Sequence, residues 1–268
     1  MKFDDRRARF RSLHEEGTFL MPNPHDIGTC RLLTALGFSA LATTSGGHAA
    51  TQGRMDMSTE RSELVEHVRA LANSTTIPLN VDAEECFPEE DGGVQGTVLL
   101  LAEAGASGCS IEDWDPRASR IEELDVAVER VARAAAEAER HGMVLTARAE
   151  NHLRGVDDLD DTVRRLTAYQ EAGAHVVYAP AVPDLDGIER IVIETHAPVN
   201  VLLQPGGPTV TQLEQVGVRR VSVGSALARI AYGAFVEAAE ILLETGKLEE
   251  SRPYLDRDLA SRAFTAAM

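Results

Sequence analysis

Acidic residues stand at the ends of short apolar segments that have the composition of β-strands. Asp82 and Glu84 close one segment, Glu112 closes the next, and Asp56 follows an earlier one at 40–45. Carboxylates at successive strand ends converge only if the strands are parallel and wound into a barrel. Such a cluster offers the oxygen ligands that Mg²⁺ prefers. The spacing therefore predicts a Mg²⁺ site, with Mn²⁺ as an alternative ion. Glu84 could instead be a solvated loop acid, and Glu112 could pair with an arginine.

Two further segments carry groups that suit an anionic substrate. Arg148 follows the tight apolar run 145–147, where a guanidinium is costly unless it is paired. Its planar fork suits a substrate carboxylate or phosphonate, the alternative being a structural ion pair with Glu112 or Glu150. Ser45-Gly46-Gly47 follows another expected strand and offers backbone N–H groups and a hydroxyl that could cradle a carboxylate. The same tripeptide also occurs in ordinary loops.

Strand-like and helix-like patterns alternate along the chain, and these elements must position the acids. The expected strands are Thr18–Met21, Ala40–Thr44, Leu79–Ala83, Gly108–Glu112, Val144–Arg148, Val176–Ala179, Val199–Leu203 and Arg220–Val223. The expected helices are Ile27–Leu36, Ser58–Asn73, Val94–Ala104, Ile121–His141, Leu159–Ala172, Leu185–Thr195, Thr211–Gln215 and Ser225–Thr245. This alternation indicates right-handed βαβ crossovers and a parallel sheet.

Eight such units predict a single (β/α)₈ TIM barrel that spans residues 1–268. An open, doubly wound sheet is the alternative, and it is disfavoured because no GxGxxG motif opens a helix after a strand. The segment 248–268 extends beyond the eighth unit, where it could pack on its own barrel or on a partner subunit.

The composition disfavours some classes of binding partner and indicates a cellular compartment. The formal charge is 26 − 43 = −17 at pH 7, which disfavours binding to nucleic acid or to an anionic membrane surface. The three cysteines are scattered and form no CxxC pair, as is typical of a reducing compartment. The N-terminal residues form no apolar signal segment, and no apolar run approaches the roughly 18 residues of a membrane helix. We therefore expect a cytoplasmic protein.

Several segments, taken in order, resemble the isocitrate lyase/phosphoenolpyruvate mutase superfamily over nearly the whole chain. They are Asn23–Asp26, Gly37-Phe38, Thr44–Gly47, Gly53–Asp56, Val81–Glu84, Ala104–Ala106, Ile111–Asp113, Ala147–Glu150, Ala168-Tyr169, Glu171–Ala174 and Gly217–Gly224. The resemblance implies a (β/α)₈ barrel whose last helix is swapped between subunits, usually in a dimer of dimers.

The same resemblance implies roles for individual residues. Mg²⁺ would bind directly to Asp82, and Asp56, Glu84 and Glu112 would hold it through water. Ser45, Gly46 and Gly47 would hold the substrate carboxylate, and Arg148 would bind its anionic end. The expected substrate-binding set is therefore Ser45, Gly46, Gly47, Asp82 and Arg148, and the expected catalytic residues are Arg148, Ser45 and Glu112.

Family substrates are small 2-oxo acids or hydroxy-dicarboxylates, which react through a metal-stabilised, pyruvate-like enolate. This chain departs from the lyase branches, which carry a Lys-(Lys/Arg)-Cys-Gly-His loop after the fourth strand. The corresponding region, Trp114–Arg120, contains no cysteine or histidine, and it lacks the asparagine of the mutase branch. Glu84 stands where most relatives have Asp, and Ala179-Pro180-Ala181 lacks a glutamate of the lyases.

Three functions follow from these observations. The first is a Mg²⁺-dependent lyase or decarboxylase that cleaves a C–C bond next to a 2-oxo or hydroxy carboxylate, as in oxaloacetate decarboxylase-like relatives. The second is P–C bond chemistry, as in a phosphonomutase or a phosphonopyruvate hydrolase. The third is a barrel that binds a keto acid without turning it over.

Overall fold

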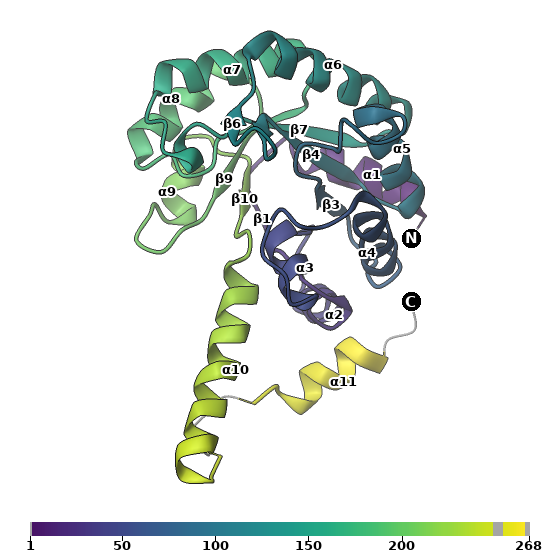
Figure 1. Ribbon diagram of the computed structural model, residues 1–268, viewed down its shortest axis with the longest axis vertical. Coiled ribbons are helices and arrows are strands. Elements are labelled where there is room, and N and C mark those ends of the chain that lie inside the picture. Colours follow the sequence, from purple (N-terminus) through teal and green to yellow (C-terminus); the bar gives the residue numbers. More distant parts are fainter. Residues whose placement is uncertain (1, 249–253, 266–268) are drawn as a thin grey trace.

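The computed structural model describes residues 2–248 and 254–265, and its centre is a nearly closed barrel of eight parallel strands with helices around it (Figure 1). The strands are β1 (Phe19–Met21), β2 (Leu41–Ala42), β3 (Leu79–Asp82), β4 (Gly108–Glu112), β7 (Val144–Arg148), β8 (Val176–Tyr178), β9 (Val199–Leu202) and β10 (Arg220–Ser222). The predicted (β/α)₈ class is confirmed, and each expected strand is present with shifts of one or two residues at its ends.

The helices are α1 (Phe3–Ser12), α2 (Ile27–Ala35), α3 (Ser45–Thr51), α4 (Arg61–Ala72), α5 (Gly93–Ala104), α6 (Leu124–Arg140), α7 (Leu159–Glu171), α8 (Leu185–Thr195), α9 (Val210–Gln215), α10 (Ala226–Thr245) and α11 (Arg257–Thr265), with a short 3₁₀ turn η1 (His152–Arg154). A two-stranded antiparallel hairpin, β5 (Trp114–Asp115) with β6 (Arg120–Ile121), follows β4. The sequence patterns predict neither α1, α3, α11 nor this hairpin.

The strand order is β1-β10-β9-β8-β7-β4-β3-β2, so the two end strands of the sheet are β1 and β2. Strand β1 pairs in parallel with β10, where Phe19 lies opposite Arg220. Across the seam between β1 and β2, the Ala42 N–H donates to the Pro22 carbonyl at 3.1 Å. The barrel is therefore continuous apart from this seam, and all strand C-termini reach the same rim.

Helix spacing explains how the outer layer covers the barrel. In α6, Ala127, Val131, Ala134 and Ala138 recur every three or four residues and are all buried, which gives the helix one apolar face toward the sheet. The small side chains allow close packing, in keeping with a core of mainly aliphatic residues.

Acidic residues define the starts of two helices. Asp158 caps α7, because its side chain accepts from the Asp161 N–H at 2.9 Å. The hydroxyls of Ser58 and Thr59 do not cap α4. Glu60 is its N-cap, and the Glu63 carboxylate accepts from the Glu60 N–H at 3.0 Å. This contact satisfies a backbone donor at the start of the helix.

The buried Arg220 side chain links strand β10 to strands β9 and β7 and to His14. The Arg220 Nε donates to Asn200 Oδ1 at 2.9 Å, its Nη2 donates to Thr146 Oγ1 at 2.8 Å, and its Nη1 lies 3.4 Å from His14 Nε2. His14, just after α1, contacts the Phe10 carbonyl through Nδ1 at 2.8 Å. Burial, together with the charge of Arg220, lowers the pKa of His14 from 6.5 to about 3.

This burial predicts an acid-sensitive stability. The folded protein holds His14 neutral, whereas the unfolded chain takes up a proton near pH 6.5. The stabilisation is therefore fully present above about pH 6.5 and is lost as the pH falls toward 3. Between pH 7 and pH 5, His14 alone should remove about 2 kcal/mol from the free energy of unfolding. Urea titrations of the wild type and of His14→Gln, which keeps a donor and an acceptor, should differ by that amount in their pH dependence. Parallel curves would contradict the assignment.

The C-terminal helices leave the barrel. Helix α10 projects away from it, and α11 turns back beneath α2 and α3 (Figure 1). Within the same chain α11 packs on α2, and Ala263 is buried. The ends of the predicted 248–268 extension, at 249–253 and 266–268, lie outside the described residues. None of the helices described in 2–248 and 254–265 is long and apolar enough to cross a membrane.

Candidate active site

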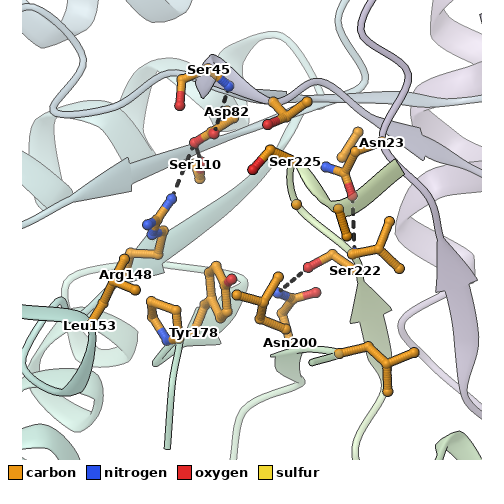
Figure 2. Close-up of a pocket in the computed structure, with 18 of the residues that line it drawn as sticks. Asn23, Ser45, Asp82, Ser110, Arg148, Leu153, Tyr178, Asn200, Ser222 and Ser225 are labelled. Carbon is orange, nitrogen blue, oxygen red and sulfur yellow. Dashed lines mark hydrogen bonds and ion pairs between the residues drawn. The ribbon is translucent and has the colours of Figure 1, made fainter. Parts of the chain in front are cut away.

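A cavity of about 690 Å³ opens at the carboxyl ends of the strands (Figure 2). Five of the predicted residues line it, and they come from separate elements of the barrel: Ser45, Asp56, Asp82, Glu112 and Arg148. The convergence that the sequence predicted for these strand ends is therefore present, and the cavity is the candidate active site.

Asp82 ends β3 and lies at the centre of the cavity's polar contacts. Its Oδ2 accepts from the Ser45 N–H at 3.1 Å, and its Oδ1 lies 3.2 Å from Arg148 Nη1. The Asp82 N–H in turn donates to Thr43 Oγ1 at 2.9 Å, which holds the strand end against β2. The carboxylate thus joins the start of α3 to β7 across the cavity, as Figure 2 shows.

All three side-chain nitrogens of Arg148 face carboxylates. Its Nη1 lies 3.2 Å from both Asp82 Oδ1 and Glu112 Oε2, while Nε and Nη2 lie 2.9 and 2.7 Å from Glu150 Oε1. Burial opposes the charge, but Glu112, Glu150 and Asp82 raise the pKa of Arg148 well above its ordinary value. The ion pairs with Glu112 and Glu150 that the sequence left open as an alternative are both present.

Glu112 ends β4 and is almost completely buried. Its Oε2 pairs with Arg148, but its Oε1 has no hydrogen-bond partner among the described residues. Burial raises the pKa of Glu112 well above its ordinary value, an effect that Arg148 opposes and Glu150 reinforces. A buried carboxylate oxygen without a donor is costly, and a cation or a bound water would satisfy it.

Glu84 does not close β3, so the expectation that both Asp82 and Glu84 end this strand is wrong for Glu84. The strand ends at Asp82, and Glu84 lies in a turn with φ 51°. Its side chain is buried in a small pocket beside the main cavity, next to Asp82, and its Oε1 has no partner among the described residues. Burial raises the pKa of Glu84 to about 8, and the neighbouring charges of Asp82, Glu85 and Asp56 add to the effect.

The Ser45-Gly46-Gly47 segment forms the first turn of α3 and is not a loop. Thr44 is the N-cap, and its hydroxyl accepts from the Gly47 N–H at 3.3 Å. A Cβ on Gly46 would lie 3.1 Å from the Asp56 carboxylate, so the missing side chain lets Asp56 approach. Ser45 lines the main cavity, whereas Gly46 and Gly47 do not. Two consecutive glycines are poor helix formers, which hid this helix from the sequence pattern.

The chain matches the family model described as phosphoenolpyruvate phosphomutase over residues 10–243. It belongs to the phosphoenolpyruvate mutase family. The match confirms the resemblance to phosphoenolpyruvate mutases that the order of sequence segments indicated.

Two related proteins and one solved structure are similar to this chain. An uncharacterized protein of Mycobacterium tuberculosis (strain ATCC 25618 / H37Rv) is 30% identical over 250 residues, covering 92% of this chain and 93% of that protein. Oxaloacetate decarboxylase 2 of Pseudomonas fluorescens (strain Pf0-1) is 29% identical over 165 residues, 60% of this chain and 56% of that protein. A crystal structure of a candidate lyase/mutase from Burkholderia cenocepacia J2315 has a TM-score of 0.93 at 42% identity, covering 98% of this chain and 97% of the other.

Within this barrel, the carboxylates do not form a closed metal cage. Among residues 2–248 and 254–265, no three His, Cys, Asp or Glu side chains are placed to hold a metal ion together. Asp82 faces the cavity directly, Asp56 and Glu112 line it, and Glu84 lies behind it. The arrangement therefore suits an ion that takes few direct protein ligands and reaches the other carboxylates through water.

Sequence reasoning missed the polar floor of the cavity. Tyr178, Asn200 and Ser222 line it from β8, β9 and β10, and Asn200 Nδ2 donates to Ser222 Oγ at 3.1 Å (Figure 2). These polar residues occur inside short apolar strands, and that position could have marked them as facing the barrel interior. His48, which follows Gly47, does not line the main cavity, and its ring stacks on that of His67 with centroids 3.8 Å apart.

Proposed function

We propose that this member of the phosphoenolpyruvate mutase family is a Mg²⁺-dependent lyase or decarboxylase. It would cleave a C–C bond next to a 2-oxo or hydroxy carboxylate. The observation that carries the proposal is that Arg148 pairs with both Asp82 and Glu112 at the strand ends, in a cavity large enough for a small acid. The likeness to an oxaloacetate decarboxylase supports the same class of reaction.

The carboxylates fit a divalent cation. Buried Oε1 atoms of Glu84 and Glu112 lack hydrogen-bond partners among the described residues, and the like charges of Asp82, Glu85 and Asp56 lie around Glu84. In this proposal Asp82 binds Mg²⁺ directly, and Asp56, Glu84 and Glu112 hold it through water; Mn²⁺ would serve as well. Such an ion supplies positive charge beside the substrate oxygens on which negative charge develops as the bond breaks.

The remaining polar groups orient the substrate. The Ser45 hydroxyl, with the neighbouring Gly46 and Gly47, would receive the substrate carboxylate at the start of α3. The Ser45 N–H now donates to Asp82, and it becomes free when that carboxylate turns toward a cation. Arg148 would hold the carboxylates of Asp82 and Glu112 in place and add positive charge beside the substrate. Decarboxylation needs no acid from a gating cysteine, so the Trp114–Arg120 hairpin is compatible with it.

P–C bond chemistry is the second candidate, because the matched family model describes a phosphomutase. Purified protein with Mg²⁺ should release pyruvate from oxaloacetate or from a substituted malate, detected by a coupled lactate dehydrogenase assay. Phosphorus NMR of phosphonopyruvate under the same conditions tests for a phosphonomutase or a phosphonopyruvate hydrolase. Ligand-induced thermal stabilisation without any product would instead indicate a barrel that binds a keto acid and does not turn it over.

We also propose that α10 mediates a homo-oligomer, with the helix swapped between subunits in a dimer of dimers. The helix projects from the barrel, and most of its apolar side chains are exposed, among them Ile230, Phe235 and Leu243. Helix α10 of a second copy of the chain would offer a matching apolar surface. A cytoplasmic location, a single domain and a lack of nucleic-acid or membrane partners stay predictions from the sequence.

A further inference from the structure

Arg154 is one of four arginines that line the cavity, and its surroundings differ from those of Arg148. It lies in η1, directly after β7, and lines the same cavity. Arg148 engages Asp82, Glu112 and Glu150 with all three of its nitrogens, at 2.7–3.2 Å. The fork of Arg148 is therefore filled by carboxylates of the protein itself.

The side-chain N–H groups of Arg154 make fewer and longer contacts with the protein's own carboxylates. Its Nε lies 3.2 Å from Glu150 Oε2, and its Nη2 lies 3.8 Å from Glu112 Oε1. Neither contact has hydrogen-bond geometry, and no described residue accepts a hydrogen bond from this side chain. Both acids lie closer to Arg148 than to Arg154.

Trp114 holds the Arg154 guanidinium in position. The Arg154 Cζ lies 4.0 Å from the centroid of the indole ring, a cation–π contact with the first strand of the β5–β6 hairpin. A planar cation that is fixed on an aromatic face, with unused donors beside a cavity, is suited to bidentate binding of a carboxylate.

We propose that Arg154, held on Trp114, binds a second carboxylate of the substrate, at the end remote from the group held near Ser45 and Asp82. This inference rests on the proposed function and deepens it: the substrate is a dicarboxylate and not a 2-oxo monocarboxylate. Arg154 then determines specificity, and the hairpin supplies the platform that fixes its orientation.

The test compares two probes on the full-length protein with Mg²⁺ by isothermal titration calorimetry. Oxalate offers the two-carbon end alone, whereas 3,3-difluorooxaloacetate adds a distal carboxylate. Arg154→Gln should weaken binding of 3,3-difluorooxaloacetate by about 10-fold or more and leave the oxalate affinity within about twofold. Trp114→Leu, which keeps the charge and removes the platform, should weaken the same probe selectively. Arg117→Gln is the matched control, since this exposed arginine of the hairpin pairs with Glu89 at 3.7 Å and does not line the cavity.

The outcomes separate the subsite from the proposed function. If the wild type binds both probes and Arg154→Gln changes neither affinity, or changes both equally, the subsite is wrong and the metal-dependent function stands. If the wild type binds neither probe with Mg²⁺, the proposed function fails and the subsite fails with it. Arg154→Lys provides a second variant that keeps the charge but lacks the fork. It should show a smaller loss confined to 3,3-difluorooxaloacetate, and full retention of that affinity would contradict bidentate binding.

Discussion

Asp82→Asn is expected to abolish both Mg²⁺ binding and turnover. Asp82 is the only one of the four predicted metal-binding acids that lies at a strand end and is engaged from two sides in the cavity, by the Ser45 N–H and by Arg148. The amide keeps the shape of the side chain but removes the negative charge that a hard cation requires. Calorimetry with Mg²⁺, together with pyruvate release, measures the loss.

A graded series makes this result specific. Asp56→Asn and Glu112→Gln should weaken Mg²⁺ binding by roughly 10- to 100-fold, as is usual for groups that act through water, and Asp82→Asn should weaken it more. The fold should persist in Asp82→Asn, because Arg148 keeps its ion pairs with Glu112 and Glu150. Circular dichroism and thermal unfolding provide that control. A Mg²⁺ affinity in Asp82→Asn equal to that of the wild type would show that the metal site has been placed wrongly.

Charges on the exposed face of α10 should dissociate the oligomer. Phe235 and Leu243 are 71% and 88% exposed in the single chain, so each would bury a large apolar area against a second copy. Burying such a side chain contributes roughly 1.5–3 kcal/mol, whereas an unpaired carboxylate in the same place is strongly unfavourable. Phe235→Asp combined with Leu243→Asp should therefore give a particle near the chain mass of 28.9 kDa in size-exclusion chromatography with light scattering.

A matched substitution on another surface separates this effect from general loss of stability. Ile193 on α8 is also exposed, at 59%, but lies on the outer side of the barrel. Ile193→Asp should leave the oligomer intact. A wild type that is monomeric at micromolar concentration, or a double variant that keeps the oligomer, would contradict a role for α10.

The barrel could be predicted from sequence because its signals are local and repeated. Eight apolar segments alternate with helical periods, and each strand pairs with neighbours at the same rim. The segments that escaped prediction depend on tertiary context. Helix α3 has glycines 46 and 47 in its first turn, which have low helix propensity, and the hairpin at 114–121 pairs only two residues per strand.

The candidate site was predictable where a side chain projects from the end of a regular strand. Asp82, Glu112 and Arg148 meet because strand register fixes their direction. Glu84 was misplaced because its positive φ turns the chain after β3, and no local pattern announces that turn. Arg154 was missed because its role depends on Trp114, forty residues away in the chain. Pairings of this kind exist only after folding.

The pairing of the first strand, β1, with the last strand, β10, has a consequence for how the chain reaches its native state. Strand β1 forms its ladder with β10, so Phe19 must find Arg220, about 200 residues later. A contact of such high sequence separation is entropically costly and forms late. During synthesis, β1 therefore cannot pair until β10 has been made. A chain that ends before residue 220 lacks the partner strand that closes the barrel. The rim around the cavity is therefore complete only after β10, the last strand along the chain, has joined the barrel.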